Sequence, residues 1–308
     1  MDNSSPNAGG ESAASHTKTD VSTPQHGSHD RPGEPVHNLS SPPAALRPSE
    51  LNRPPSLTSL LLNSAPQSFY VATQHPFLRQ AGLGTLPKET LQRWLSQDRL
   101  YAQSYIGFIG ALISRVDLPY NVTDQSKSLR WRIVNLLSSA LENIHRELRF
   151  FNDTAEKYGL QIDASSRPGV PFTAEPATKQ YIDLFRAFGT DPSMSLLEGL
   201  VVLWATEKCY LTAWTFASSF MKPSGPPEPH ADDDGGALRG EFIPNWTSSD
   251  FEKFVEDIAK VTDLLAEREN AINRRFNVYT AVWVHILDIE AKFWPSVEEE
   301  EAKNEEAS

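Results

Sequence analysis

The chain has 308 residues, of which 39% are hydrophobic and 10% aromatic, and its formal net charge is -12 at pH 7. This acidic balance excludes an ordinary nucleic-acid-binding protein, which needs clustered Lys and Arg to displace counterions from phosphates. The single cysteine excludes an internal disulfide or a cysteine-based zinc cluster. No stretch approaches the roughly 18 apolar residues of a membrane span, and the first residues do not resemble a signal peptide. We therefore expect a cytoplasmic protein that does not bind membranes.

The two ends of the chain differ in composition from the middle. Residues 1–55 are rich in Ser, Pro, Gly, His and Asn, and no Phe, Trp or Tyr occurs before Phe69. Such a segment cannot bury enough apolar surface to offset the entropy lost on ordering, so we predict a disordered tail. Residues 297–308 are rich in Glu, which predicts a second, acidic disordered tail. Between the tails we predict one helical domain at residues 56–296.

Within that domain, apolar and aromatic side chains recur every three or four positions, which is the period of an amphipathic helix. No sustained period-two alternation and no glycine-rich phosphate loop is present, so the sequence indicates neither a β-sheet nor a nucleotide-binding fold. We predict an all-α, single multi-helix bundle whose site lies between helices. The expected helical segments are residues 56–62, 66–75, 88–116, 126–158, 178–188, 193–221, 249–269 and 272–294.

A long connection at residues 222–247 interrupts the helical pattern. It contains several prolines and glycines and the acidic run Asp232-Asp233-Asp234. Loops of this length are often insertions or lids, so we expect an insertion or a mobile flap. The three aspartates could hold a metal ion, but we expect a solvated acidic loop.

Three acidic residues fall on apolar faces of three different predicted helices. Asp98, Glu207 and Glu290 each have aromatic residues three or four positions away, so acids and rings share one face. A carboxylate on such a face costs free energy unless it is paired, hydrogen-bonded or protonated, and a structural cap or ion pair explains a single case. Three cases favour a common pocket. We then expect at least one pKa to rise towards neutrality, which suits general acid–base catalysis.

Tyrosines and one cysteine complete the candidate site. Tyr101, Tyr181 and Tyr210 each offer a ring face to a flat heterocycle and a hydroxyl to a carboxyl group or polar substituent. Cys209 is a candidate nucleophile. It lies about 200° around the helix from Glu207, however, so the two cannot face the same pocket. We place Glu207 in the pocket, because aromatic neighbours form a continuous stripe with it, and predict that Cys209 is a small buried hydrophobic residue.

Three segments resemble the TenA/thiaminase II family, whose members have the haem-oxygenase-like fold. These segments are His75-Pro76-Phe77 with Gly84-Thr85-Leu86-Pro87 and Gln97-Asp98-Arg99-Leu100-Tyr101, then Pro176-Ala177-Thr178-Lys179-Gln180-Tyr181, and finally Glu290-Ala291-Lys292-Phe293-Trp294. Their order and spacing agree over residues 56–295. The resemblance implies that Asp98, Tyr101 and Tyr181 contact the substrate and that Glu290 handles a proton.

Two departures indicate a particular branch of that family. Thiaminase II members carry a catalytic Cys where this chain has Glu207, whereas a Glu-containing branch of eukaryotic type shows the pattern W-A-x-E-x-x-Y, as at residues 204–210. The family's Tyr before the penultimate helix is also absent, because residues 246–251 are too short to hold it. The branch resembles hydrolases that act on aminopyrimidine or formylaminopyrimidine fragments of thiamin.

The resemblance therefore implies a thiamin-pyrimidine salvage hydrolase that breaks a C–N bond without a metal or another cofactor. Glu207 would activate water, Glu290 would protonate the leaving amine, and Asp98 would bind the exocyclic amine and a ring nitrogen. The three candidate tyrosines would hold and stack the pyrimidine, with Phe293 as an apolar wall. The expected partner is a small heterocycle of the pyrimidine type, and the tetramers of the family imply a homo-oligomer.

Two other functions remain open from the sequence. A non-catalytic small-molecule-binding or regulatory protein on the same fold is favoured by the loss of the family thiol, the missing Tyr and the long tail. A protein that handles a haem or quinone cofactor is disfavoured. His75 precedes Pro76 at a helix end, and neither it nor His285 has a glycine-rich partner helix that would admit a macrocycle.

Overall fold

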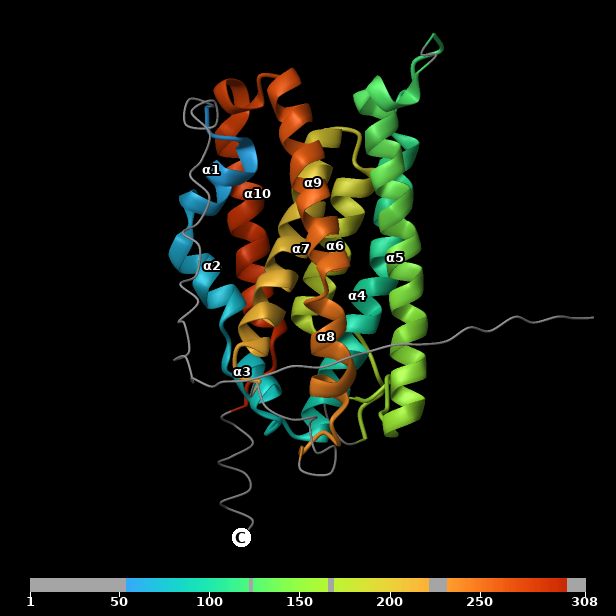
Figure 1. Cartoon of the computed structure of the whole chain (residues 1–308), viewed down its shortest axis with the longest axis vertical. Helices are drawn as coiled ribbons and strands as arrows, with labels where there is room; N and C mark the ends of the chain where they lie inside the picture. The colour runs from blue at the N-terminus through green and yellow to red at the C-terminus, as the bar shows by residue number, and fades with distance from the viewer. Residues whose placement is uncertain (1–53, 122–123, 166–168, 222–231, 298–308) are drawn as a thin grey trace, which may run out of the picture. The chain divides into compact units, whose positions relative to one another are not determined.

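The computed structural model describes residues 54–121, 124–165, 169–221 and 232–297, which all belong to one compact unit, Pro54–Ser308. All regular structure in these ranges is helical (Figure 1), which confirms the predicted all-α class. The two predicted tails lie outside the described residues except for their innermost positions. None of the described helices combines the length and the apolar character that crossing a bilayer requires.

The eight predicted segments each correspond to a described helix in the same order, and four further elements occur among the described residues. The elements are α1 (Leu57–Ser64), α2 (Pro66–Thr73), α3 (Pro76–Leu83), α4 (Lys88–Ser114), η1 (Gln125–Lys127), α5 (Leu129–Tyr158), α6 (Pro176–Thr190), α7 (Leu196–Ser218), η2 (Leu238–Phe242), α8 (Ile243–Trp246), α9 (Ser249–Arg268) and α10 (Ala271–Phe293). The helix α3, which begins after the His75-Pro76 break, the short η1 and the pair η2 and α8 were not among the expected segments.

Local capping signals fix several helix ends. The hydroxyl of Ser56 accepts a hydrogen bond from the backbone N–H of Ser59 and begins α1. Helix α7 begins with a capping box, in which Ser195 and Glu198 each accept a hydrogen bond from the other residue's backbone N–H. Helix α5 ends at Gly159, whose φ of 62° suits a residue without a side chain.

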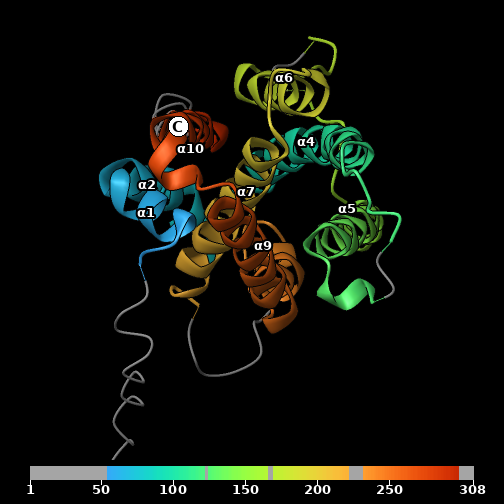
Figure 2. The ribbon, with the colours of Figure 1, turned by 90° about the horizontal axis from the view of Figure 1, so that it is seen from above.

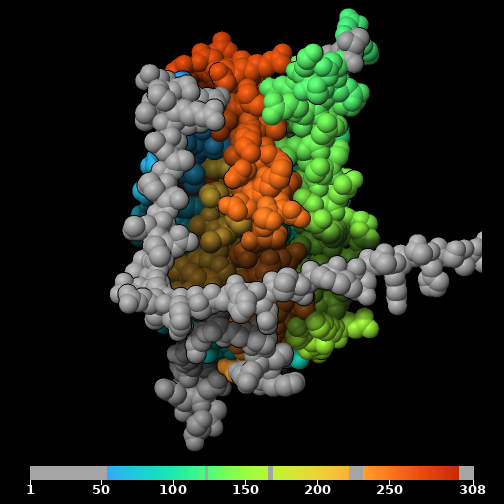
Figure 3. Space-filling model, viewed as in Figure 1, coloured from blue at the N-terminus to red at the C-terminus, as the bar shows by residue number. Residues whose placement is uncertain are grey.

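Helix α7 runs through the middle of the arrangement and contacts α2, α3, α8, α9 and α10 (Figure 2). Its first half is buried on every side, including all residues 197–206, which explains why it carries no polar stripe. Helix α4 packs against α5 and α6 on the other side. On the face shown in Figure 3, α9 lies against α5, so α4, α5, α7 and α9 surround a common interior.

The segment before α9 corrects the prediction of a solvated loop. Its described part, from Asp232 onward, contains η2 and α8. Asp232 and Asp234 are buried: Asp232 forms an ion pair with Arg239, and Asp234 accepts hydrogen bonds from the backbone N–H groups of Gly236 (3.0 Å) and Leu238 (2.7 Å). Two of the three aspartates were therefore wrongly assigned to solvent: the Asp234 carboxylate accepts from backbone N–H groups at the start of η2, and the Asp232 carboxylate pairs with the Arg239 side chain.

Candidate functional site

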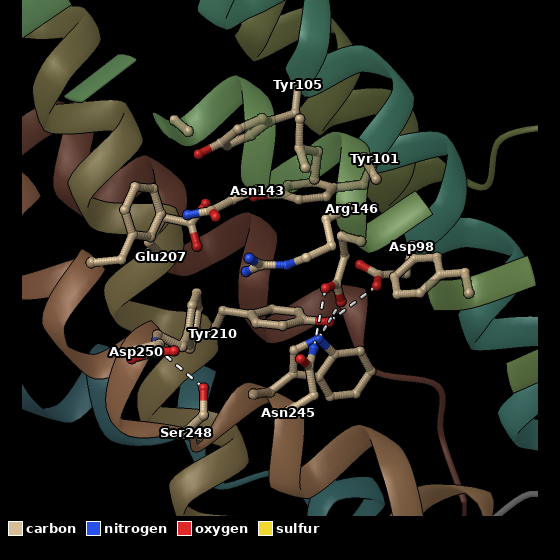
Figure 4. Close-up of a pocket in the computed structure, with 18 residues that line it drawn as sticks. Asp98, Tyr101, Tyr105, Asn143, Arg146, Glu207, Tyr210, Asn245, Ser248 and Asp250 are labelled. Carbon is tan, nitrogen blue, oxygen red and sulfur yellow. Dashed lines mark hydrogen bonds between the residues drawn. The ribbon is translucent and has the colours of Figure 1, made fainter. Parts of the chain in front are cut away.

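A cavity of about 160 Å³ lies between α4, α5, α7 and the segment from α8 into α9 (Figure 4). Cavities of about 150 Å³ admit a single benzene-sized ring, so this one has the size of a small monocyclic ligand. Its lining combines carboxyl groups with aromatic rings, and these side chains come from parts of the chain that are far apart in sequence.

Helix α4 contributes Asp98, Tyr101 and Tyr105, which share one face because they lie three and seven positions apart. Asp98 is 2% exposed, and its Oδ2 accepts a hydrogen bond from the hydroxyl of Tyr210 at 3.1 Å. Burial raises the pKa of Asp98 well above its ordinary value, and the nearby carboxyl of Glu147 adds to this, while the Tyr210 hydrogen bond opposes it.

Helix α7 contributes Glu207 and Tyr210 to the cavity, as the stripe of aromatic neighbours predicts. Burial raises the pKa of Glu207 to about 7, with Glu147 adding to the shift and the hydroxyl of Tyr105 opposing it. Cys209 is fully buried and does not line the cavity, and burial raises the pKa of its thiol well above the ordinary value. The orientation expected for this helix is thus observed, with the acid towards the cavity and the thiol away from it.

Three of the predicted site residues lie one layer behind the cavity. Tyr181 donates a hydrogen bond to Oε2 of Glu290, and neither residue lines the cavity, nor does Phe293. The ring of Tyr101 packs edge-on against Tyr181, with centroids 5.0 Å apart, and lies 6.1 Å from Phe293. Tyr101 therefore lies between the cavity and the buried pair, so the seven-residue site expected from the sequence is divided into two layers.

Glu290 has the features of a proton-holding group in this second layer. It is 4% exposed, and burial raises its pKa to about 7, with the Tyr181 hydrogen bond opposing the shift and Glu207 adding to it. Among the described residues, none donates a hydrogen bond to its Oε1 atom. The predicted rise of at least one pKa towards neutrality is thus found at both Glu207 and Glu290.

Helix α5 supplies a carboxyl group that the sequence reasoning missed. Glu147 lines the cavity and accepts hydrogen bonds from Nε1 of Trp246 and from Nδ2 of Asn245, the latter at 3.2 Å. Burial raises the pKa of Glu147, and both hydrogen bonds oppose the shift. The sequence did carry a signal for Glu147. It lies on the same helix face as three apolar residues, Ala140 and Ile144 before it and Phe151 after it, and all three line the cavity.

The segment from α8 into α9 closes the cavity. Asn245, Trp246, Ser248, Asp250 and Phe251 all line it, although the sequence assigned the first two of these to a loop (Figure 4). The ring centroids of Trp246 and Tyr210 lie 5.2 Å apart, so these two rings form a continuous aromatic wall of the cavity. The cavity thus depends on the register of α8, which Glu147 anchors.

These groups can exchange protons with a ligand near neutral pH. The pKa of Glu207 is raised to about 7, and its side chain faces the same cavity as Asp98, whose pKa is also raised. A carboxyl group with such a pKa can act as a general base and can later return the proton. No group of three His, Cys, Asp or Glu side chains in the described ranges is arranged to hold a metal ion.

Comparison with known proteins agrees with this architecture. The profile of the TENA/THI-4/PQQC family matches residues 65–300. A protein of Fusarium pseudograminearum named "Probable transcription factor" is 31% identical over 281 residues, which are 80% of this chain and 54% of that protein. This chain thus spans about half the length of that relative. An uncharacterized protein of Schizosaccharomyces pombe is 25% identical over 205 residues, which are 61% of this chain and 78% of that protein.

Solved structures of TenA proteins have the same fold. A TenA homologue from Pyrococcus furiosus superposes with a TM-score of 0.60 at 20% identity, covering 77% of this chain and 98% of that one. A TenA family transcription regulator from Silicibacter sp. TM1040 superposes with a TM-score of 0.61 at 16% identity, and the superposition covers 77% of this chain and 94% of that one. The expected haem-oxygenase-like fold is confirmed by these neighbours, and the family profile covers most of the chain. The chain therefore belongs to the TENA/THI-4/PQQC family, the TenA/thiaminase II family that its motifs resemble.

Proposed function

We propose that this protein is a hydrolase of the thiamin-pyrimidine salvage type, acting on an aminomethyl- or formylaminomethyl-pyrimidine. The observation that carries the proposal is a ring-sized cavity in which Glu207, with a pKa of about 7, faces the same space as Asp98 and Tyr210. An acid that is half-ionised near neutral pH suits a general base that activates water. The aromatic walls suit a flat heterocycle.

Each residue has a defined role in this proposal. Glu207 takes a proton from water, which then attacks the carbon that bears the nitrogen, and the C–N bond breaks as the amine leaves. Asp98, held by the hydroxyl of Tyr210, binds the exocyclic amine and a ring nitrogen of the pyrimidine. Tyr101 and Tyr210 stack on the ring. These groups come from α4 and α7, two helices that hold the side chains rigidly.

Glu290 takes part as the proton donor to the leaving amine, but only after a side-chain movement. It lies behind Tyr101 and is hydrogen-bonded to Tyr181. In the proposal, ligand binding turns the ring of Tyr101 aside and brings the second layer, including Phe293, into contact with the ligand. The Oε1 atom of Glu290, which has no hydrogen-bond partner among the described residues, then carries the proton and donates a hydrogen bond to the leaving amine.

The experiment that tests the proposal is a product assay. Purified protein is incubated with aminomethyl-pyrimidine or formylaminomethyl-pyrimidine, and the release of hydroxymethyl-pyrimidine is followed by chromatography. We expect product from at least one of the two compounds. If neither compound yields hydroxymethyl-pyrimidine above the rate without protein, the proposed activity is wrong.

A second candidate function is a non-catalytic binder or regulator that uses the same cavity. The names of two similar proteins favour this function, namely the probable transcription factor of Fusarium and the transcription regulator of Silicibacter. Glu207→Gln distinguishes the two functions. An enzyme loses turnover and retains ligand binding, whereas a binder shows no turnover in either form and changes only in affinity.

A further inference from the structure

The cavity contains more acidic groups than the proposed reaction uses. Asp98 and Glu207 have roles in the proposal, whereas Glu147 lines the same cavity from α5 without one. Glu147 is the strongest electrostatic neighbour of Asp98 and also acts on Glu207, so the three carboxyl groups lie close enough to influence one another. Bringing like charges together costs free energy, and this arrangement therefore calls for a compensating ligand or proton.

A purely structural role does not account for Glu147. Its two oxygens accept hydrogen bonds from Trp246 and Asn245, and an anchor for α8 needs only these acceptors. An ionised carboxyl group offers about four acceptor positions, so two remain beyond those already used. Its charge, by contrast, acts unfavourably on Asp98 in the absence of a ligand. The anchoring of α8 therefore does not explain why this position carries a negative charge.

The charges and rings around Glu147 are those of a site for an organic cation. The charged groups that line the cavity with Glu147 come from four helices, and only one of them is basic: Asp98 on α4, Arg146 on α5, Glu207 on α7 and Asp250 on α9. Ring faces of Tyr210, Trp246 and Phe251 line the same space. Carboxylates beside aromatic faces bind ammonium groups through charge-assisted hydrogen bonds and cation–π contacts.

We propose that Glu147 is a ligand-binding residue that selects ligands carrying a positively charged amine on an aromatic ring. The inference deepens the proposed function and rests on it only for the identity of the ring. Of the two compounds named above, it selects aminomethyl-pyrimidine, whose primary amine is protonated at neutral pH, over the uncharged formylaminomethyl-pyrimidine.

The selection has a consequence for turnover. Hydrolysis converts the ammonium compound and water into an alcohol and ammonium ion, with the C–N bond broken and a C–O bond formed. The charge leaves with the ammonium ion, so the alcohol that stays behind is neutral. A cavity that holds the cation through Glu147 therefore binds the substrate more tightly than the product and favours product release.

The test compares ligands that differ in charge and share a ring. Binding of aminomethyl-pyrimidine and hydroxymethyl-pyrimidine, and of benzylamine and benzyl alcohol, is measured by calorimetry with the full-length protein at pH 7.5. We expect the amine of each pair to bind about tenfold more tightly or better, which is the strength of one hydrogen bond to a charged group. Amine binding should also release protons, because the cation favours the ionised form of carboxyl groups whose pKa is raised.

Three variants assign the preference to Glu147. Glu147→Gln keeps the shape and removes the charge, and we expect it to reduce the amine preference to about threefold or less. Glu142→Gln makes the same change at an exposed position of the same helix and should leave the preference unchanged. Trp246→Phe removes the anchoring hydrogen bond but keeps the charge of Glu147, so it should retain the preference if charge and not anchoring is responsible.

The outcomes separate this inference from the proposed function. Equal binding of amine and alcohol in both pairs, or a preference that persists in Glu147→Gln, overturns the inference and leaves the hydrolase proposal to its own product assay. A Glu147-dependent preference for benzylamine, with no binding of either pyrimidine, supports the inference and contradicts the pyrimidine assignment. Failure of all four compounds to bind overturns the inference, and the product assay with formylaminomethyl-pyrimidine then decides the hydrolase proposal.

Discussion

Replacing Glu207 by Gln replaces one oxygen of the cavity's proposed general base with an amide nitrogen, and it should change activity and stability in opposite directions. The carboxyl group lies beside Asp98 and within the influence of Glu147, and its pKa is raised from 4.5 to about 7. The amide cannot accept a proton from water. We therefore expect kcat to fall by about 10²–10⁴-fold, the usual contribution of a general base, while binding of the pyrimidine is retained.

The stability change follows from the same pKa. A carboxyl group whose pKa is raised on folding binds more protons in the folded state than in the unfolded state between pH 4.5 and about 7, so the free energy of unfolding falls as pH rises through this range. The full shift corresponds to about 3 kcal/mol above pH 7, and we expect about 2 kcal/mol because the side chain borders a cavity. Glu207→Gln avoids this cost, so its stability relative to the wild type should increase between pH 5 and pH 8 by that amount.

Two measurements check this prediction. Denaturant unfolding of both proteins at pH 5 and pH 8 gives the stability difference. The pH dependence of kcat gives the titration of the base as the acidic limb of a bell-shaped profile centred near pH 7 in the wild type, since Glu207 must be ionised and Glu290 protonated. Glu142→Gln, an exposed change of the same type, is the control and should alter neither quantity. A variant that retains wild-type turnover, or a stability difference that is the same at both pH values, would refute the assignment of Glu207 as a buried base.

Three further substitutions test the surroundings of the site. Cys209→Ala should leave kcat/KM within about twofold, because the thiol is buried outside the cavity, and a loss of about tenfold or more would indicate thiol chemistry. Gly84→Ala should lower the free energy of unfolding by about 1–3 kcal/mol, because φ is +76° and the new Cβ would lie 2.6 Å from Oδ1 of Asp232; an unchanged melting temperature would contradict this. Asp234→Ala removes two hydrogen bonds at the start of η2 and should cost about 1–2 kcal/mol and raise KM by loosening Trp246, whereas an unchanged KM would show that α8 holds its position independently.

Local sequence patterns were sufficient to predict which way a side chain points where the residue shares a helix face with aromatic rings. Asp98 and Tyr101 on α4, and Glu207 and Tyr210 on α7, all line the cavity as their spacing indicated. Orientation around a helix follows from the 3.6-residue period, so the opposite placement of Cys209 was also predictable. Their catalytic and binding roles remain predictions, since the arrangement of the side chains does not by itself test them.

Local patterns were insufficient where the site depends on contacts between distant segments. Glu147 lies on an apolar stripe, but its anchoring of α8 becomes visible only when Trp246 and Asn245 donate hydrogen bonds to it from a segment about 100 residues later. The residues around Asp232 contain glycine and a dense acidic run, so their composition predicted a solvent-exposed loop. Their burial depends on the partner Arg239 and on backbone N–H groups of η2, which propensity does not report.

The sequence by itself determined the all-α class, most helix boundaries and the inward direction of Asp98 and Glu207, because hydrophobic periodicity and capping act over a few residues. The tertiary structure decided the rest. It divided the predicted group into a cavity layer and a buried Tyr181–Glu290 layer separated by Tyr101, and it added Glu147 to the acids of the cavity. The physical reason is that packing distances between helices, and the burial that raises each pKa, arise only when segments far apart in the chain are brought together.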